Sequence, residues 1–332
     1  MIFQHPLPLA RYRVTAQAQQ PLPLPHYAGS LLRGPLGAAL RSMACMTRLP
    51  ACPGCPLLAT CPYSRIFEAP PPAKGQHQLQ DFSNIPNPYV IEPPTPGARV
   101  LAAGETLQFH LVLVGHAVGQ LPLLLFALQR ALAQGLTRQR IPLSLQQVDW
   151  LDTQGQSQSQ SQPIWNQVWS QAAPTVANHP STLQVPTPPA PCNSIALHIH
   201  TPMRLQQQSI PLGLGQLSPR ALVAAVVRRA ALLMEFHAGQ NGWGQAARHI
   251  TQQSETLQDT QHLRWFDWTR YSSRQQQEMT LGGVVGQWTL HGPSDTLTTL
   301  WPWLWLGQWL HVGKNATMGM GGYTLLPALS TA

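Results

Sequence analysis

The sequence predicts an α+β protein in which the element order βαββαβ occurs twice. Stretches that alternate apolar and polar residues mark strands, and an apolar spacing of three to four residues marks helices. Both patterns occur in the first half of the chain and return in the same order after residue 193. At 332 residues the chain is long enough for two domains of about 150 residues each. The doubled order predicts two tandem ferredoxin-like domains.

The first domain is expected over residues 1–152. Its strands are predicted at 7–17, 88–93, 106–115 and 143–152. Its helices are predicted at 27–43, kinked at Pro35, and at 121–135, ended by Gly135. A cysteine-rich insert at 45–61 follows the first of these helices.

A linker or insert is expected over residues 153–193. Residues 153–203 contain no Asp, Glu, Lys or Arg, and they include the runs QGQSQSQSQ and TPPAPC. A stretch rich in Gln, Ser and Pro is typical of a flexible connection. Its single cysteine, Cys192, is interpreted as incidental.

The second domain is expected over residues 194–332. Residues 194–205 alternate as a strand, and Ser218 followed by Pro219 predicts the start of a helix that ends at Gly239. The segments LRWFDWTRYSS and MTLGGVVGQWTLHG are predicted as a strand pair. A Trp-rich helix over 294–311 and a last strand in GYTLLPAL complete the order.

Charge and hydropathy narrow the class of protein. Only 10% of residues are charged, yet the net charge is +8, and 18 of the 20 basic residues are Arg. Arginine grips phosphate with a planar fork, so this balance favours nucleic-acid binding, although the codon bias of a GC-rich genome would also enrich Arg. The longest apolar run, from Leu121 to Leu132, is too short to span a membrane and carries Arg130. The N-terminus lacks the pattern of a signal peptide, so a soluble cytoplasmic protein is expected.

Four cysteines predict a metal site. Cys45, Cys52, Cys55 and Cys61 have the spacing C-x6-C-x2-C-x5-C. Four thiolates so close in sequence suit a structural zinc ion, since a closed set of four ligands leaves no position for catalytic water. An iron–sulfur cluster and free or paired thiols are the alternatives.

A glycine-rich segment, HVGKNATMGMGGYTL, lies between the last predicted helix and strand. Its glycines would let the backbone approach a phosphate, and Lys314 would add charge. It is not a Walker P-loop, because Asn315 stands where Ser or Thr would hold magnesium. A tight turn that simply requires glycine is the alternative.

The spacing G-x5-G-x-G of Gly313, Gly319 and Gly321 before the last strand resembles the glycine-rich loop of RAMP proteins. Further blocks resemble the CRISPR repeat-processing endoribonucleases, the sixth Cas protein family: HYAGSLLRGPLGAALR, CPGCPLLATCPYSRIFE, PYVIEPP, TPMRL, RYSSRQ and LGGVVGQWTL. These blocks are spread over most of the chain outside residues 153–193.

The resemblance implies a mechanism without a catalytic metal. A 2′-hydroxyl of the repeat RNA would attack the adjacent phosphate and leave a 2′,3′-cyclic phosphate and a 5′-hydroxyl. This reaction needs proton transfers and a cation for the phosphorane, and histidine suits the former. The resemblance also implies that RNA lies between the domains and that the protein stays on the guide RNA with other Cas effector subunits.

Candidate residues follow from their positions in these blocks. In the family the working histidine usually lies near the first helix, where this chain has His26 and Tyr27. His26 is therefore expected to transfer a proton, with Tyr27 orienting it and Arg33 contacting the phosphate. His77 with Lys74 is the second choice and His311 the third. The residues expected to bind RNA are Gly313, Lys314, Asn315, Thr317, Gly319, Gly321, Arg204, Arg270 and Arg274.

Two rival functions remain open. One is a subunit of the same architecture that binds CRISPR repeat RNA without cutting it. The other is a metal-dependent nuclease or redox protein that uses the four cysteines, although a closed four-thiolate site rarely carries out hydrolysis.

Overall fold

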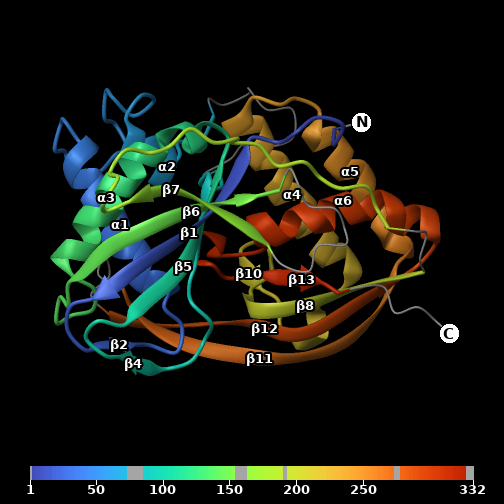
Figure 1. The fold of residues 1–332 in the computed structure, drawn as a ribbon. Coiled ribbons are helices and arrows are strands. Elements are labelled where there is room, and N and C mark those ends of the chain that lie inside the picture. The colour runs from blue at the N-terminus through green and yellow to red at the C-terminus, as the bar shows by residue number, and fades with distance from the viewer. Residues whose placement is uncertain (1, 73–84, 154–162, 190–192, 273–276, 327–332) are drawn as a thin grey trace. The chain divides into compact units, whose positions relative to one another are not determined.

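The structure is a computed structural model that describes residues 2–72, 85–153, 163–189, 193–272 and 277–326, and of 270–272 and 277–279 only the backbone (Figure 1). Two compact units divide the chain. The N-terminal unit comprises Leu7–Gln184 and Leu232–Gln240, and the C-terminal unit comprises Met1–Pro6, Val185–Ala231 and Asn241–Ala332.

The N-terminal unit is built on a five-stranded antiparallel sheet in the order β3-β5-β1-β6-β7. Along the chain, β1, β3, β5 and β6 are the four strands of a βαββαβ run, and they lie in the order 2-3-1-4. Strand β7 extends the edge at β6, and β2 with β4 forms a separate ribbon. Its elements are β1 (Leu9–Ala18), β2 (Leu22–Leu24), α1 (Gly29–Ala44), α2 (Pro62–Phe67), β3 (Tyr89–Glu92), β4 (Arg99–Leu101), β5 (Thr106–Val114), the 3-10 helix η1 (Gly115–Gln120), α3 (Leu121–Gln134), β6 (Leu143–Asp152) and β7 (Ile164–Ser170).

Strand β1 shows how the sequence pattern builds this unit. Its residues alternate between buried and half-buried, so that Tyr12 and Val14 join the core with helices α1 and α3. Arg11 and Arg13 alternate with them and therefore lie on the opposite face of the sheet. Helices α1 and α3 pack side by side, as Figure 1 shows.

The C-terminal unit has a four-stranded antiparallel sheet in the order β11-β12-β8-β13. This is again the order 2-3-1-4 of a βαββαβ run, with α4 and α6 as its helices. Helix α4 contributes residues to both units. The elements are β8 (Ser194–Met203), β9 (Gln206–Gln207), β10 (Ile210–Pro211), η2 (Leu214–Gln216), α4 (Pro219–Ala238), α5 (Trp243–Gln253), η3 (Ser254–Thr256), β11 (Gln258–Ser272), β12 (Gln277–His291), α6 (Ser294–Leu310), η4 (Ala316–Met318) and β13 (Tyr323–Leu325).

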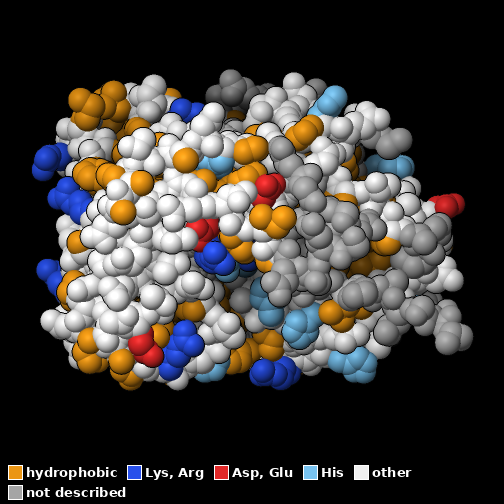
Figure 2. All heavy atoms as spheres, viewed as in Figure 1, with side chains coloured by type: hydrophobic (Ala, Val, Ile, Leu, Met, Phe, Trp, Pro, Cys, Tyr) orange, Lys and Arg blue, Asp and Glu red, His pale blue; other side chains and the backbone are white. Residues whose placement is uncertain are grey.

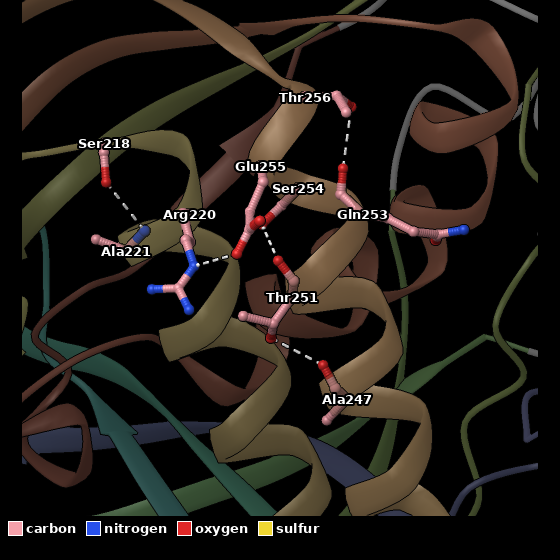
Figure 3. A network of polar contacts seen from close by, with 9 residues as sticks. All are labelled: Ser218, Arg220, Ala221, Ala247, Thr251, Gln253, Ser254, Glu255 and Thr256. Atoms are coloured by element: carbon pink, nitrogen blue, oxygen red, sulfur yellow. Dashed lines mark hydrogen bonds and ion pairs between the residues drawn. The ribbon is translucent and has the colours of Figure 1, made fainter.

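Side-chain caps fix the helix ends in this unit. The amide of Ala221 donates to Ser218 Oγ at 3.2 Å, which confirms Ser218 as the predicted cap of α4 (Figure 3). Arg220 pairs with Glu255 at 3.0 Å and thereby ties the first turn of α4 to η3. The hydroxyl of Ser254 donates to the carbonyl of Thr251, where α5 ends.

The structure differs from the predicted element list in several places. The segment 153–193, expected as a linker, contributes β7, and the units divide between Gln184 and Val185. Helices α2 and α5 and the ribbon β2–β4 were not predicted. The last strand is shorter than GYTLLPAL, and 327–329 lie outside the described residues. In the part of the chain that the structure describes, no helix has both the length and the apolar character needed to cross a membrane.

Candidate functional site

The glycine-rich segment forms a tight loop between α6 and β13. Gly313, Gly319 and Gly321 have φ angles of 89°, 83° and 73°, and Asn315 has a φ of 63°. The loop lies along the end of β8: the amide of Lys314 donates to the carbonyl of Arg204, and that of Gly321 donates to the carbonyl of Pro202, both at 2.9 Å.

Two of these glycines are required by the backbone of the loop itself. A Cβ on Gly313 would collide with the carbonyl of Arg204, and a Cβ on Gly321 would collide with the carbonyl of Val312. Positive φ angles add to this requirement. A tight turn that requires glycine therefore explains Gly313 and Gly321 without any ligand. The same turn determines which side chains of the loop face outward.

His311 and Thr201 form the buried floor of the loop. The ring nitrogen Nδ1 of His311 lies 2.9 Å from the carbonyl of Gly319, and the Thr201 hydroxyl donates to that carbonyl at 2.7 Å. Thr201 also accepts a hydrogen bond from the amide of Gly322. His311 is only 2% exposed, so it supports the loop and is not placed to reach an RNA phosphate.

The outer side of the loop carries the polar side chains predicted to bind RNA. Lys314 is exposed, and Asn315 and Thr317 are half-buried. Arg204 is also half-buried and donates from its guanidinium to the carbonyl of Gly282 on β12 at 3.2 Å. The structure thus brings Arg204 and Lys314 together. The side chain of Arg270 and the whole of Arg274 lie outside the described residues.

The predicted catalytic residues lie in the N-terminal unit at the start of α1. His26 is exposed, and its carbonyl accepts a hydrogen bond from the amide of Gly97 at 2.9 Å. Tyr27 is only 2% exposed, and burial, followed by the nearby Glu92 carboxylate, raises its pKa well above the ordinary value. The phenol is therefore neutral and internal, and it cannot contact RNA without a local rearrangement. His77 and Lys74 lie outside the described residues.

Arg33 projects from the second turn of α1 towards α2. Its guanidinium carbon lies 5.5 Å from the centroid of the Phe67 ring, and its Nε is buried without a hydrogen-bond partner among the described residues. Phe67 stacks in turn on Tyr89 with ring centroids 4.6 Å apart. The buried Nε is out of reach of an RNA oxygen, so a phosphate contact by this half-buried side chain would use the terminal guanidinium nitrogens.

A charged row that the sequence analysis missed crosses the sheet face opposite α1 and α3. Arg11 pairs with Glu92 at 2.6 Å, and Arg13 pairs with Asp149 at 2.9 Å. Arg13 also lies over the ring of Trp165 at 4.8 Å. Partners 81 and 136 residues apart meet only because of the strand order, so no local signal could have identified them.

His110 belongs to the same row. It stacks on Trp165 with ring centroids 5.3 Å apart and lies 3.6 Å from a Glu92 oxygen. Burial, with Arg11 as the next contribution, lowers the pKa of His110 to about 4 despite the opposing effect of Glu92. The imidazole is therefore neutral at physiological pH.

The four cysteines of the insert line one small pocket between α1 and α2, together with residues that include Thr47 and Leu58. All four are half-buried free thiols. Burial and then Glu68 raise the pKa of the Cys52 thiol to about 11. Among the described residues, no three His, Cys, Asp or Glu side chains are already arranged to hold a metal ion.

The acidic side chains on the drawn face of the molecule are few and scattered (Figure 2). On the face drawn in Figure 2, the Asp and Glu side chains lie apart from one another, and some of them lie next to Lys or Arg side chains.

Comparison with protein-family models gives two matches. Residues 7–181 match the model AF_1859_N, described as an N-terminal domain, and residues 197–323 match the model described as CRISPR-associated endoribonuclease Cas6. The first match covers just over half of the chain. Comparison with curated proteins found no match.

Solved structures share the fold. A product complex of Cas6 from Thermus thermophilus matches with a TM-score of 0.57 and 16% identity, covering 96% of this chain and 99% of that one. A second Thermus Cas6 product complex matches with a TM-score of 0.50 and 17% identity, at 96% and 99% coverage. A chain of a partial Cas6-RT-Cas1–Cas2 complex matches with a TM-score of 0.55 and 16% identity; this chain is covered completely but spans only 48% of that longer one.

Two successive units with the same strand order, and a glycine-rich loop before the last strand of the second, define a protein of the RAMP type. The chain belongs to the AF_1859_N family through its first half and carries a Cas6 endoribonuclease domain in its second, which makes it a Cas6-type protein.

Proposed function

We propose that this chain cleaves CRISPR repeat RNA to mature guide RNA without a catalytic metal, using two ferredoxin-like domains and acting in the cytoplasm. The match of residues 197–323 to the Cas6 endoribonuclease model is the observation that carries the proposal. Two of the similar structures are Cas6 product complexes, and the matching family model describes an endoribonuclease, which supports RNA as the substrate.

The proposed reaction is an internal transfer at one phosphate. The 2′-oxygen loses its proton and forms a bond to phosphorus, while the bond from phosphorus to the 5′-oxygen breaks and that oxygen gains a proton. The products are a 2′,3′-cyclic phosphate and a 5′-hydroxyl. His26 carries out one of the two proton transfers, because it is an exposed imidazole at the start of α1.

Arginine stabilises the charge that develops on the phosphorane. Arg33 is assigned this role because it is a half-buried cation near the start of α1 whose guanidinium is supported by the ring of Phe67. Tyr27 is assigned to anchoring the start of α1 below His26, since its side chain is buried.

The glycine loop holds the RNA backbone in this proposal. Lys314, Asn315 and Thr317 offer donors along its outer side, and Arg204 lies beside them. Arg270 and Arg274 extend the same set by their place in the strand pair. After cleavage the protein remains on the guide RNA and joins other Cas proteins, as the name of the Cas6-RT-Cas1–Cas2 complex illustrates for a similar chain.

A second candidate function is recognition of the repeat without cleavage. The burial of Tyr27 and His311 favours this function. Among the predicted catalytic histidines that the structure describes, it leaves only His26 accessible to RNA. The two functions differ in one observable, the cutting of bound RNA.

The test is incubation of the pure protein with its own labelled repeat RNA and with a scrambled repeat, each with EDTA added at the start of the reaction. One cut in the true repeat, with a cyclic phosphate on the 5′ fragment, is the expected result. Tight binding without a cut would assign the binding function instead. A cut that EDTA abolishes while the melting temperature of the protein stays unchanged would point to a metal-dependent nuclease and contradict the proposal.

A further inference from the structure

The four cysteines meet at the junction of two helices. Cys45 directly follows the last residue of α1, and Cys61 directly precedes the first residue of α2. Cys52 and Cys55 lie in the loop that joins these helices, and all four side chains line the same pocket. A residue set spread over 17 positions is thereby folded around one point.

The contacts of the sulfur atoms show that the four thiols lie close to one another. The Thr47 hydroxyl lies 3.9 Å from Cys45 Sγ and 3.4 Å from Cys55 Sγ, so one oxygen is in reach of both thiols. Cys61 Sγ lies 3.9 Å from the carbonyl of Ala44, beside Cys45. Cys52 and Cys61 pack on the same hydrophobic core.

The loop backbone keeps the C-x2-C pair in a turn. The amide of Cys55 donates to the carbonyl of Cys52 at 2.9 Å, and the amide of Cys61 donates to the carbonyl of Leu57 at 2.8 Å. Such a turn presents two cysteine side chains to one side, as in the chelating half of a structural zinc site. No pair of the four is joined as a disulfide in the described structure.

We propose that this pocket binds one zinc ion through Cys45, Cys52, Cys55 and Cys61. Zinc bonds thiolate sulfur at about 2.3 Å in a tetrahedron, which places the sulfurs about 3.8 Å apart. Rotation of the half-buried cysteine side chains towards the pocket, away from the Thr47 hydroxyl, closes the set. With four protein ligands the ion is structural and has no place for a reacting water.

The ion cross-links the end of α1 to the start of α2. Helix α2 is only six residues long, and its Phe67 packs so closely on α1 that a Cβ on Gly37 would come within 2.8 Å of the ring. The same ring supports Arg33. Zinc therefore holds in place the Phe67 ring that supports Arg33. The importance of this support for cleavage rests on the proposed function, whereas the metal site itself does not.

The experiment uses the full chain, reduced and stripped of metal, titrated with Zn²⁺ against a chromophoric chelator. One bound zinc ion per chain is expected, with release of protons from the thiols. Cys52→Ser and Cys61→Ser are expected to lose stoichiometric binding. Cys192→Ser is the matched control, because this fifth cysteine lies outside the described residues and outside the C-x6-C-x2-C-x5-C set.

Unchanged zinc binding in the two pocket variants, or none in the wild-type chain, would overturn the proposal. An absorbing iron–sulfur chromophore in the protein as isolated would likewise replace zinc by a cluster. Should the variants fold poorly, the wild-type chain supplies the second measurement: added Zn²⁺ must raise its melting temperature and slow hydrogen exchange in α2. The absence of both effects counts against the site, whatever the RNA assay shows.

Discussion

The glycine loop of the C-terminal unit and the start of α1 in the N-terminal unit carry separate sets of candidate residues, and the structure constrains the two sets very differently. The loop is fixed by its own backbone, with Lys314 and Gly321 hydrogen-bonded to the end of β8 and His311 buried beneath. His26 is an exposed residue just before a helix. The loop has the rigidity expected of a binding element, and His26 has the access to solvent that proton transfer requires.

This difference explains why the two sets of residues are not equally easy to recognise in the sequence. The close backbone approach at Gly313 and Gly321 tolerates only glycine, so the spacing of these glycines identifies the loop in the sequence. Position 26 carries an exposed side chain, and no pattern of glycine spacing marks it in the sequence. A catalytic residue can be assigned there only by position.

The largest predicted effect separates chemistry from binding. His26→Ala is expected to slow cleavage of repeat RNA by about 10²–10⁴-fold, the usual contribution of a general acid or base, with RNA affinity little changed. Single-turnover cleavage and a filter-binding titration measure the two quantities. His249→Ala, an exposed histidine on α5, is the control and keeps wild-type rates. Wild-type cleavage by His26→Ala would remove this residue from the mechanism.

The next effect tests the rigidity of the loop. Gly321→Ala forces a Cβ into the carbonyl of Val312 at a φ of 73°, and a loss of about 2–4 kcal/mol in unfolding free energy is expected. Thermal denaturation would show a fall of roughly 10 °C. Gly215→Ala has open space around its Cβ and an ordinary φ, so it serves as control. Equal melting temperatures for the two variants would show that the loop is not held as described.

A third prediction concerns the charged row of the N-terminal unit. The folded pKa of His110, about 4, lies below its ordinary value of 6.5, so the unfolded chain binds more protons between these pH values. Stability is therefore complete above pH 6.5 and falls as the pH drops towards 4, by up to about 3 kcal/mol. Urea unfolding measured over this range should flatten in His110→Gln but not in His198→Gln, an exposed histidine. An equally steep profile in His110→Gln would contradict the assignment.

The smallest effect is expected at Lys314. Removing one phosphate contact by Lys314→Ala should weaken repeat RNA binding by about 1 kcal/mol and lower the salt dependence by about one ion. Arg248→Ala, an exposed cation on α5, is the matched control. If both variants bind alike at every salt concentration, the outer side of the loop does not contact the RNA backbone.

Local patterns predicted most of the architecture. Both βαββαβ runs, the Ser218 cap and the long strand pair follow from periodicity and helix-start signals, and the structure has them. Strand β7 was missed because the segment around it lacks charge and alternation. It forms a strand because it pairs with the edge strand β6, a tertiary contact that has no local signal in the sequence. Helix α2 is too short to have a helical period.

The candidate site was predictable only in part for a related reason. Sequence neighbours such as Gly313 and Lys314 could be grouped in advance, whereas the support of Arg33 by Phe67 depends on tertiary packing. The burial of Tyr27 just before α1 likewise results from tertiary packing. These contacts belong to the fold and have no signature along the chain.

Single-turnover incubation with repeat RNA in EDTA, comparing an all-ribose strand with one carrying a single 2′-deoxy nucleotide at the cut, tests the central claim most directly. The proposed mechanism predicts cleavage of the first strand and none of the second, with both bound equally well. Cleavage of the 2′-deoxy strand at the same position would contradict attack by the 2′-hydroxyl and, with it, the proposed metal-independent mechanism.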